Sequence, residues 1–232
     1  MSYMRAAMER YEMIEEGDII AVGVSGGKDS VALLCALAGL RRFYPQHFEL
    51  KAVTLDPGFL NAEGDYSAIE ALCARLGVEY TVKRTNLYHV IFETRKEQNP
   101  CSLCARMRRG MLHDAAKALG CNKIALGHHR DDAAQTALMN LFNGGEFACF
   151  SPKSYLSRKD LYLIRPMIFV SEHYIEKVVK REGLPVVKSA CPADGVTERQ
   201  EVGELIEELE KKYESLPLKI LHALQKGNIS GW

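Results

Sequence analysis

Runs of apolar residues along this chain are followed by stretches in which apolar side chains recur at helical spacing. Residues 19–24 (IIAVGV) are all apolar, as expected for a strand buried on both faces of a parallel sheet. Residues 30–40 follow with helical spacing. The succession continues with expected strands at 48–56, 78–84 and 123–128 and expected helices at 66–76, 106–119 and 131–142. Strands alternating with helices over this length predict an α/β fold, a doubly wound parallel sheet covered by helices on both faces.

The pattern becomes less regular in the last third of the chain. The expected elements there are a strand at 161–167 (LYLIRPM) and a helix at 172–181. A charged stretch from Glu198 onward is expected to be helical. We therefore divide the chain into a domain of residues 1–195 and a helical C-terminal extension of residues 196–232.

Composition narrows the classes of partner. The 232 residues include 30 basic and 30 acidic side chains, so any nucleic acid must be held by a local patch rather than by an overall positive field. The first 18 residues lack the apolar segment of a signal peptide, and no apolar run could span a bilayer, so we expect a cytoplasmic protein without a membrane partner. In that reducing compartment the seven cysteines favour metal binding or redox chemistry over disulfides.

The hexapeptide SGGKDS at 25–30 lies between an expected strand and an expected helix. Its adjacent glycines permit positive φ and leave room for a ligand. The N–H groups of such a turn, together with the helix N-terminus, favour an anion, while the serines add hydroxyls and the lysine a mobile positive charge. The aspartate suits a helix cap or a magnesium ligand. The candidate ligand-binding residues are Ser25, Gly26, Gly27, Lys28, Asp29 and Ser30.

The cysteines fall into two groups. Cys101 and Cys104 (CSLC) can hold one metal centre, and this spacing alone fits zinc, a redox disulfide or an iron–sulfur cluster. A closed zinc site would need a second pair of ligands, which the sequence does not offer. Cys191 lies in a loop-like segment, where a thiol gains little from packing, and the role of Cys149 stays open. The cysteines expected in the core are Cys35, Cys73 and Cys121.

A basic cluster directly follows the CSLC motif. Its members are Arg106, Arg108 and Arg109. On a helix, Arg106 and Arg109 share a face. The cluster is therefore either a solvated helix surface or a contact with the phosphates of an RNA.

Several motifs, taken together, carry a family resemblance. SGGKDS resembles the pyrophosphate-binding loop of the N-type ATP pyrophosphatases, the PP-loop superfamily with its adenine nucleotide alpha hydrolase-like fold. With NPCSLCARMRRG, ALGHHRDDAAQT, NLFNGGE and LIRPM in this order, the chain is similar to the tRNA 2-thiocytidine synthetase family over most of its length.

The resemblance implies a reaction and its ligands. The family adenylates C2 of cytidine 32 in the tRNA anticodon loop with ATP and Mg²⁺ and replaces its oxygen with sulfur, releasing AMP and pyrophosphate. The sulfur would arrive on the open iron of a [4Fe-4S] cluster held by three cysteines. The sulfur donor would be a cysteine desulfurase or sulfide, and a homodimer is one expected assembly. The cluster ligands implied for this chain are Cys101, Cys104 and Cys191.

The same resemblance assigns roles near the nucleotide. Lys28, Asp29 and Asp132 are expected to be catalytic, with Asp132 preferred over its neighbour Asp131. Three further residues are expected to border the nucleotide, and these are Asp56, Gly127 and His128. Two alternatives stay open at this point: the same chemistry on another RNA base or a small acceptor, and a non-catalytic nucleotide or iron–sulfur sensor.

Overall fold

The structure is a computed structural model that describes residues 2–59, 62–95, 100–187, 191 and 198–232. Its strands are β1 (Asp18–Gly23), β2 (Phe48–Asp56), β3 (Glu79–Arg84), β4 (Lys123–Ala125), β5 (Lys153–Leu156) and β6 (Leu161–Ile164). Its helices are α1 (Ser2–Arg10), α2 (Lys28–Leu40), α3 (Ser67–Leu76), α4 (Pro100–Ala118), α5 (Arg130–Gly144), α6 (Glu172–Glu182), α7 (Glu198–Glu210) and α8 (Leu216–Lys226). Two short pieces are a π-helix, η2 (His89–Thr94), and a 3₁₀ turn, η3 (Ile229–Gly231).

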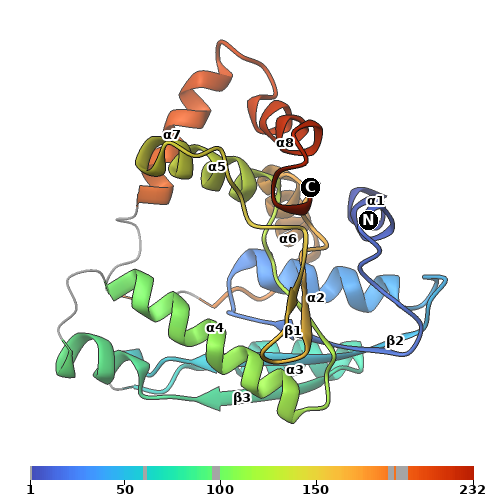
Figure 1. Ribbon diagram of the computed structural model, residues 1–232. Helices are drawn as coiled ribbons and strands as arrows, with labels where there is room; N and C mark the ends of the chain where they lie inside the picture. Colours follow the sequence, from blue (N-terminus) through green and yellow to red (C-terminus); the bar gives the residue numbers. More distant parts are fainter. Residues whose placement is uncertain (1, 60–61, 96–99, 188–190, 192–197) are drawn as a thin grey trace.

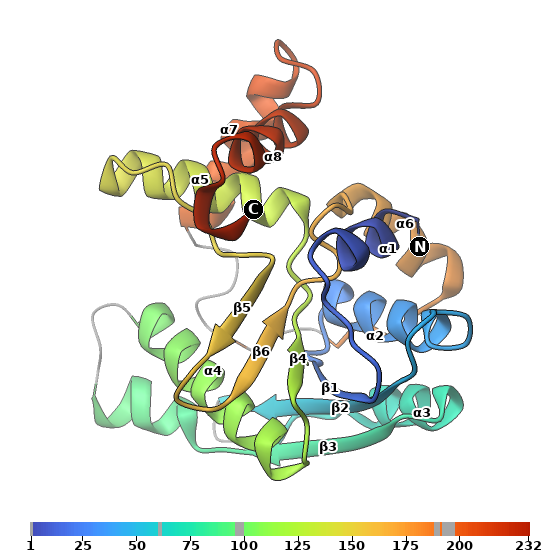
Figure 2. The same cartoon turned by 45° about the vertical axis from the view of Figure 1, so that its right-hand side comes forward.

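The strands form one sheet in the order β3-β2-β1-β4-β6-β5 (Figures 1 and 2). All neighbours pair in parallel except β5, which is antiparallel to β6. The predicted doubly wound parallel sheet is confirmed. The antiparallel edge strand β5 was not predicted, because none of its four residues is buried and its sequence therefore lacks an apolar run.

Helices cover both faces of the sheet. Ile20 and Val22 of β1 belong to a core shared with α1, α2, α3 and α6, whereas Ala21 between them faces a second core under α4. Successive side chains of a strand point to opposite faces, so the apolar run of β1 supplies both cores. Figure 2 shows α2 and α4 on opposite sides of the sheet.

The last two helices pack on α5, away from the sheet (Figure 1). Val202 and Ile206 of α7 and Leu221 and Leu224 of α8 belong to the same core as β1 and α2. The predicted boundary between residues 195 and 196 lies outside the described residues. None of the described helices has both the length and the apolar character that a membrane crossing requires.

The chain order of the strands creates a crevice at the carboxyl edge of the sheet. β1 has β2 on one side and β4 on the other, so the connections that follow β1 and β4 leave in opposite directions. Ligands of open α/β sheets bind at such a switch point. The SGGKDS loop follows β1, and the GHHRDD segment follows β4.

Among the element boundaries that differ from the predicted ones, two shape the crevice. β4 ends at Ala125 rather than at residue 128, so Gly127 and His128 lie in a loop at the strand end. α4 begins at Pro100 rather than at residue 106, so the CSLC cysteines lie in its first turns. A proline is well tolerated in the first turn of a helix, where its missing N–H has no partner to lose.

Candidate functional site

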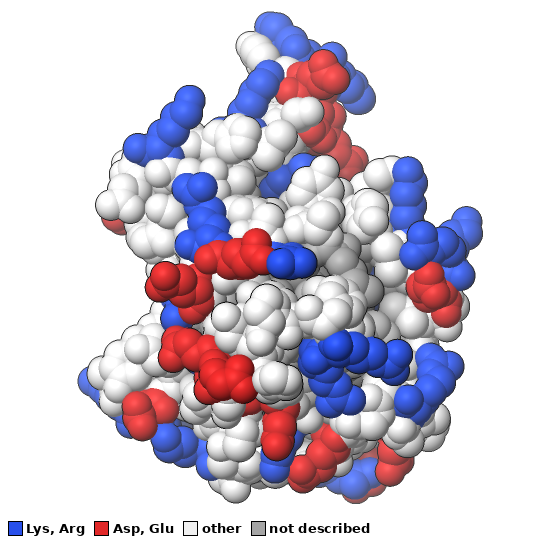
Figure 3. Space-filling model, turned by 90° about the vertical axis from the view of Figure 1, so that its right-hand side faces the viewer, with Lys and Arg blue, Asp and Glu red and all other residues white. Residues whose placement is uncertain are grey.

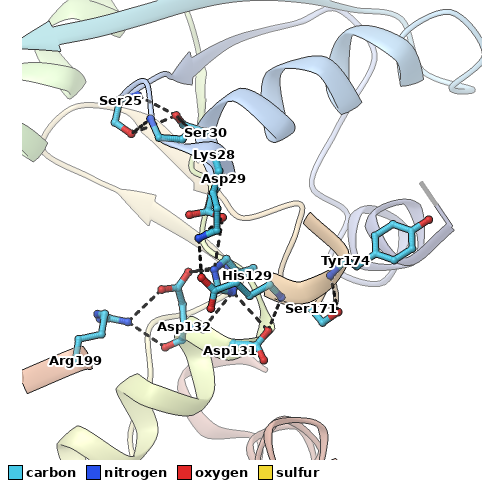
Figure 4. A network of polar contacts seen from close by, with 12 residues as sticks. Ser25, Lys28, Asp29, Ser30, His129, Asp131, Asp132, Ser171, Tyr174 and Arg199 are labelled. Carbon is cyan, nitrogen blue, oxygen red and sulfur yellow. Dashed lines mark hydrogen bonds and ion pairs between the residues drawn. The ribbon is translucent and has the colours of Figure 1, made fainter. Parts of the chain in front are cut away.

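The loop after β1 is held in shape by its own serines. The Ser25 N–H donates to Ser30 Oγ at 3.1 Å, and Ser30 Oγ donates to the carbonyl oxygen of Gly27 at 2.9 Å. The Gly27 N–H in turn donates to Ser25 Oγ at 3.3 Å. Both hydroxyls therefore tie the loop to the first turn of α2, as Figure 4 shows.

The N-terminus of α2 is free of a side-chain cap. Gly27 occupies the cap position without a side-chain hydrogen bond, so the first N–H groups of the helix have no intrahelical or capping partner. Such N–H groups, with the positive end of the helix dipole, form a binding site for a phosphate.

Two glycines allow other segments to approach this loop. Gly26 has a φ of +88°, and a Cβ there would lie 2.9 Å from Cβ of Val187. A Cβ on Gly127 would lie 3.2 Å from backbone atoms of both Asp29 and Ser30. The two loops of the crevice therefore meet at Gly127 at a distance that favours glycine.

A pocket of about 420 Å³ opens at the switch point. It is bordered by the ends of β1, β2 and β4 and by α2, α4 and α5. The predicted site residues that line it are Ser25, Asp29, Ser30, Arg108, Arg109, Gly127, His128 and Asp132. The predicted site residues outside its lining are Gly26, Gly27, Lys28, Asp56, Arg106 and the three cysteines.

Lys28 points away from the pocket lining, toward α6. Its Nζ donates to Oε1 of Glu172 at 2.6 Å and lies 3.5 Å from Oδ1 of Asp29. Burial opposes the ammonium charge, but the hydrogen bond to Glu172 and the charge of Asp29 outweigh it and raise the pKa of Lys28. The mobile cation of the loop is therefore charged and held by a carboxylate.

A buried histidine joins three carboxylates beside the loop (Figure 4). His129 Nε2 lies 3.8 Å from Oδ1 of Asp29 and 3.4 Å from Oδ2 of Asp132, while Nδ1 lies 3.6 Å from Oδ2 of Asp131. Burial lowers the pKa of His129, but the carboxylates outweigh it, and the pKa rises above its ordinary value. His129 was not a predicted site residue, although it shares the GHHRDD motif.

The two aspartates of GHHRDD have different surroundings. Asp131 Oδ2 accepts the N–H of Glu172 at 2.8 Å and so ties α5 to α6. Asp132 lines the pocket, and its Oδ2 accepts the His129 N–H at 3.0 Å in a capping box. Across from it, Asp29 Oδ1 is buried and accepts no hydrogen bond within the described residues, and burial raises the pKa of Asp29. Carboxylate oxygens are the ligands that Mg²⁺ prefers, so Asp29 and Asp132 are the groups that could hold it.

An arginine from the C-terminal region reaches Asp132. Arg199 Nη1 donates to both Oδ1 and the carbonyl oxygen of Asp132 at 3.3 Å, and Nη2 donates to Oγ1 of Thr136 at 3.2 Å. No pattern in the sequence indicates this contact, because Arg199 lies in a charged stretch typical of a solvated helix. The structure thereby brings α7 to the pocket.

Asp56 stabilises the loop that follows β2. Its Oδ1 accepts the N–H of Gly58 at 3.0 Å, and its Oδ2 accepts the N–H of Gly64 at 2.9 Å. Both carboxylate oxygens therefore bind the backbone of the loop after β2. Asp56 is buried and does not border the pocket.

The CSLC cysteines lie on the face of α4 that leads into the pocket. Cys101 and Cys104 are three positions apart, and the same face continues through Ala105, Arg108 and Leu112, which line the pocket. Arg106 is not among the residues that line the pocket, so at the pocket the expected pairing of Arg106 with Arg109 is replaced by Arg108 and Arg109. The helix thus places the cysteines at one end of the pocket.

Cys191 lies close to Cys104, although the two are far apart in the sequence. Burial raises the pKa of the Cys104 thiol, the Arg108 guanidinium opposes this rise, and the charges of Cys191 and Cys101 add to it. Among the described residues, no three His, Cys, Asp or Glu side chains converge on a single metal ion. A cubane cluster does not require such convergence, because each cysteine binds a different iron atom.

Three of the other cysteines belong to the core or pack against it, as expected. Cys73 and Cys121 are buried, and Cys35 packs against the same core as Cys73. Cys149 is also buried, its Sγ donates to the carbonyl oxygen of Ala133, and burial raises its pKa to about 12. A thiol with that pKa is a poor source of thiolate.

Comparison with known proteins shows the family to which this chain belongs. A model of the PP-loop domain matches residues 3–208. The tRNA-cytidine(32) 2-sulfurtransferase of Pelobacter propionicus is 40% identical over 94% of this chain and 81% of its own length, and that of Geobacter sulfurreducens is 38% identical over 96% and 86%.

A solved structure shares the fold. The U34-tRNA thiolase NcsA from Methanococcus maripaludis, determined with its [4Fe-4S] cluster, superposes with a TM-score of 0.80 at 24% identity, over 97% of this chain and 77% of its own. The family model and the sequence identities, each over most of the chain, agree with the pocket and the pyrophosphate loop described above. The chain therefore belongs to the PP-loop family and, within it, to the tRNA-cytidine(32) 2-sulfurtransferases.

Proposed function

We propose that this tRNA sulfurtransferase acts on cytidine 32 of the anticodon loop and replaces the C2 oxygen with sulfur, converting ATP to AMP and pyrophosphate. One observation carries the proposal. The uncapped N-terminus of α2 and the cysteine-bearing face of α4 border or lead into the same pocket. In this proposal, pyrophosphate would bind at the start of α2, and sulfur transfer would take place at the end of the pocket toward which the cysteines of α4 lie.

The first half of the proposed reaction is adenylation. The N–H groups at the start of α2 would bind the pyrophosphate portion of ATP, and Asp29 and Asp132 would hold the Mg²⁺ that neutralises it. The C2 oxygen of cytidine attacks the α-phosphorus, and the bond to pyrophosphate breaks. Lys28, once released from Glu172, would stabilise the negative charge of the leaving pyrophosphate.

The second half is sulfur transfer. Sulfide, as the hydrosulfide ion, attacks C2. The C2–oxygen bond then breaks, and AMP leaves with the oxygen. Cys101, Cys104 and Cys191 would hold a [4Fe-4S] cluster, which would supply an iron without a protein ligand for the incoming sulfur. The presence of such a cluster in the related thiolase NcsA supports this assignment. We propose as the donor either free sulfide or a cysteine desulfurase whose persulfide sulfur is released as sulfide by a thiol reductant.

The experiment follows both halves of the reaction. The anaerobically purified protein is incubated with ATP, sulfide and an unmodified tRNA that carries cytidine 32, with a uridine-32 transcript as control. We expect AMP, pyrophosphate and 2-thiocytidine in equal amounts from the first tRNA and no thiolated nucleoside from the second. ADP and phosphate as products would contradict the adenylation step. Thiolated uridine would contradict the proposed acceptor.

A further inference from the structure

One buried polar side chain of the pocket has no partner and no part in the reaction described so far. His113, on α4, is only 9% exposed. Its Nε2 is buried and has no hydrogen-bond partner within the described part of the chain, yet the residue lines the pocket. A buried ring nitrogen without a partner costs free energy unless a ligand or a water satisfies it.

The surroundings of His113 differ from those of the phosphate-binding loop. The polar loop and helix N-terminus come from residues 25–30, whereas the apolar side chains of the lining come from β2, α4 and the segment after β4. At Gly23 the packing is close, because a Cβ there would lie 3.0 Å from Leu112 Cδ2 and 3.5 Å from Leu126 Cδ2. The apolar part of the lining, which includes Val53, Leu55 and Leu126, suits the ring of a base rather than a phosphate.

The protonation state of His113 also favours a base over a phosphate as its partner. Burial lowers the pKa of the imidazole, and the nearby Arg109 lowers it further, while Asp114 opposes the shift. The ring is therefore neutral at physiological pH and offers one donor and one acceptor. A neutral imidazole can bond the polar edge of a heterocyclic base and has no charge to attract a phosphate.

We propose that His113 determines the specificity of the pocket for the base of ATP, with its Nε2 hydrogen-bonded to the polar edge of adenine. The proposal rests on the proposed function, because it takes ATP to be the nucleotide. The apolar part of the lining would hold the ring, and the loop at residues 25–30 would hold the phosphates. The adenine and guanine edges differ in their donors and acceptors, so one fixed nitrogen can discriminate between them.

The experiment measures nucleotide binding rather than turnover. Dissociation constants for a non-hydrolysable ATP analogue, the matching GTP analogue and pyrophosphate are obtained by calorimetry for the wild-type protein and for His113→Phe, His113→Gln and, as a control, His222→Gln. His222 is exposed on α8. Because one neutral hydrogen bond is lost, we expect His113→Phe to weaken the ATP analogue about tenfold. The preference over the GTP analogue should disappear, and pyrophosphate affinity should not change.

Each other outcome has a defined meaning. His113→Gln should recover part of the affinity, because its amide again offers a polar group, and its melting temperature reports whether the fold is intact. Unchanged ATP affinity and base preference in a folded His113→Phe protein would overturn the proposal. A loss confined to tRNA affinity would also overturn it, since His113 would then face the target base. A wild-type protein that binds neither analogue would instead contradict the proposed function.

Discussion

At the scale of single residues, the pocket contains ionisable groups whose partners were hidden from the sequence. The motif SGGKDS predicts a cation beside the phosphates, but the structure holds that cation on Glu172, far along the chain. The motif GHHRDD predicts a carboxylate at the pocket, and the structure distinguishes Asp132, which lines it, from Asp131, which binds α6. Motifs indicate which chemistry is present, and only the folded chain decides the partner of each group.

The Lys28–Glu172 pair leads to a prediction about ATP turnover. Lys28→Ala removes the one lysine of the loop, so kcat/KM for ATP should fall by about 10- to 100-fold, the loss of one hydrogen bond to a charged group. Glu172→Gln should act in the opposite direction and lower the KM for ATP, because Lys28 loses its closest carboxylate partner. Pyrophosphate release measured with saturating tRNA checks both. Glu182→Gln, exposed at the other end of α6, is the control and should leave KM near its original value. A higher KM for Glu172→Gln would show that Glu172 assists binding instead.

At the scale of elements, the local sequence predicts most of the sheet. The strands β1 and β2 and the helix α2 follow directly from apolar runs and helical spacing. The strand β5 could not be predicted, because an exposed edge strand has no apolar signal. The docking of α7 on α5 was equally hidden, since it depends on a contact between residues far apart in sequence. Hydrophobic periodicity and residue propensity predict one helix or strand at a time. The candidate site lies where several elements meet, so these patterns do not predict its contacts.

The contact between α7 and α5 predicts a change in the magnesium requirement. Arg199→Ala removes both hydrogen bonds from Nη1 to Asp132, so the carboxylate becomes less fixed, and the Mg²⁺ concentration for half-maximal activity should rise about two- to fivefold. The modest size reflects the partial exposure of the guanidinium. Arg199→Lys should restore part of the loss, because it keeps the charge without the forked geometry. Lys211→Ala, exposed just beyond α7, is the control. If the folded Arg199→Ala protein keeps the Mg²⁺ dependence of the wild type, Arg199 does not position Asp132.

At the scale of the whole molecule, charge is balanced overall and separated locally. Figure 3 shows basic and acidic side chains in distinct groups on one face of the molecule, and the formal net charge is zero. The tRNA must therefore be held by local contacts, and α4 supplies two arginines at the mouth of the pocket, Arg108 and Arg109.

These arginines predict a specific salt dependence. Arg109→Ala should weaken tRNA binding and reduce the slope of log affinity against log salt by about 1, the effect of one lost phosphate contact. Arg106→Ala, on the same helix but outside the pocket lining, is the matched control and should leave the slope unchanged. Filter binding at several salt concentrations measures both. Equal slopes for the two variants would assign the arginines to the solvated surface.

The arrangement of the cysteines connects the two ends of the domain and yields the last prediction. Cys101 and Cys104 share the face of α4 that leads into the pocket, and Cys191 reaches Cys104 from a distant part of the chain. If they hold a cubane, anaerobically purified protein should contain about four irons per chain. Single replacement of each of the three by alanine should abolish thiolation and lower the iron content.

The buried cysteines are the controls, and they distinguish a cluster from a general effect of thiol loss. Cys73→Ala and Cys35→Ala should keep their iron, because Cys73 lies within the core and Cys35 packs against it. Cys149→Ala should also keep its iron, since the Sγ of Cys149 is directed at Ala133 and its pKa is raised to about 12. Iron analysis and the visible absorption of the anaerobic protein measure these outcomes without reference to activity. Stoichiometric zinc in place of iron would refute the cluster, and full thiolation by Cys191→Ala would remove Cys191 from its ligands.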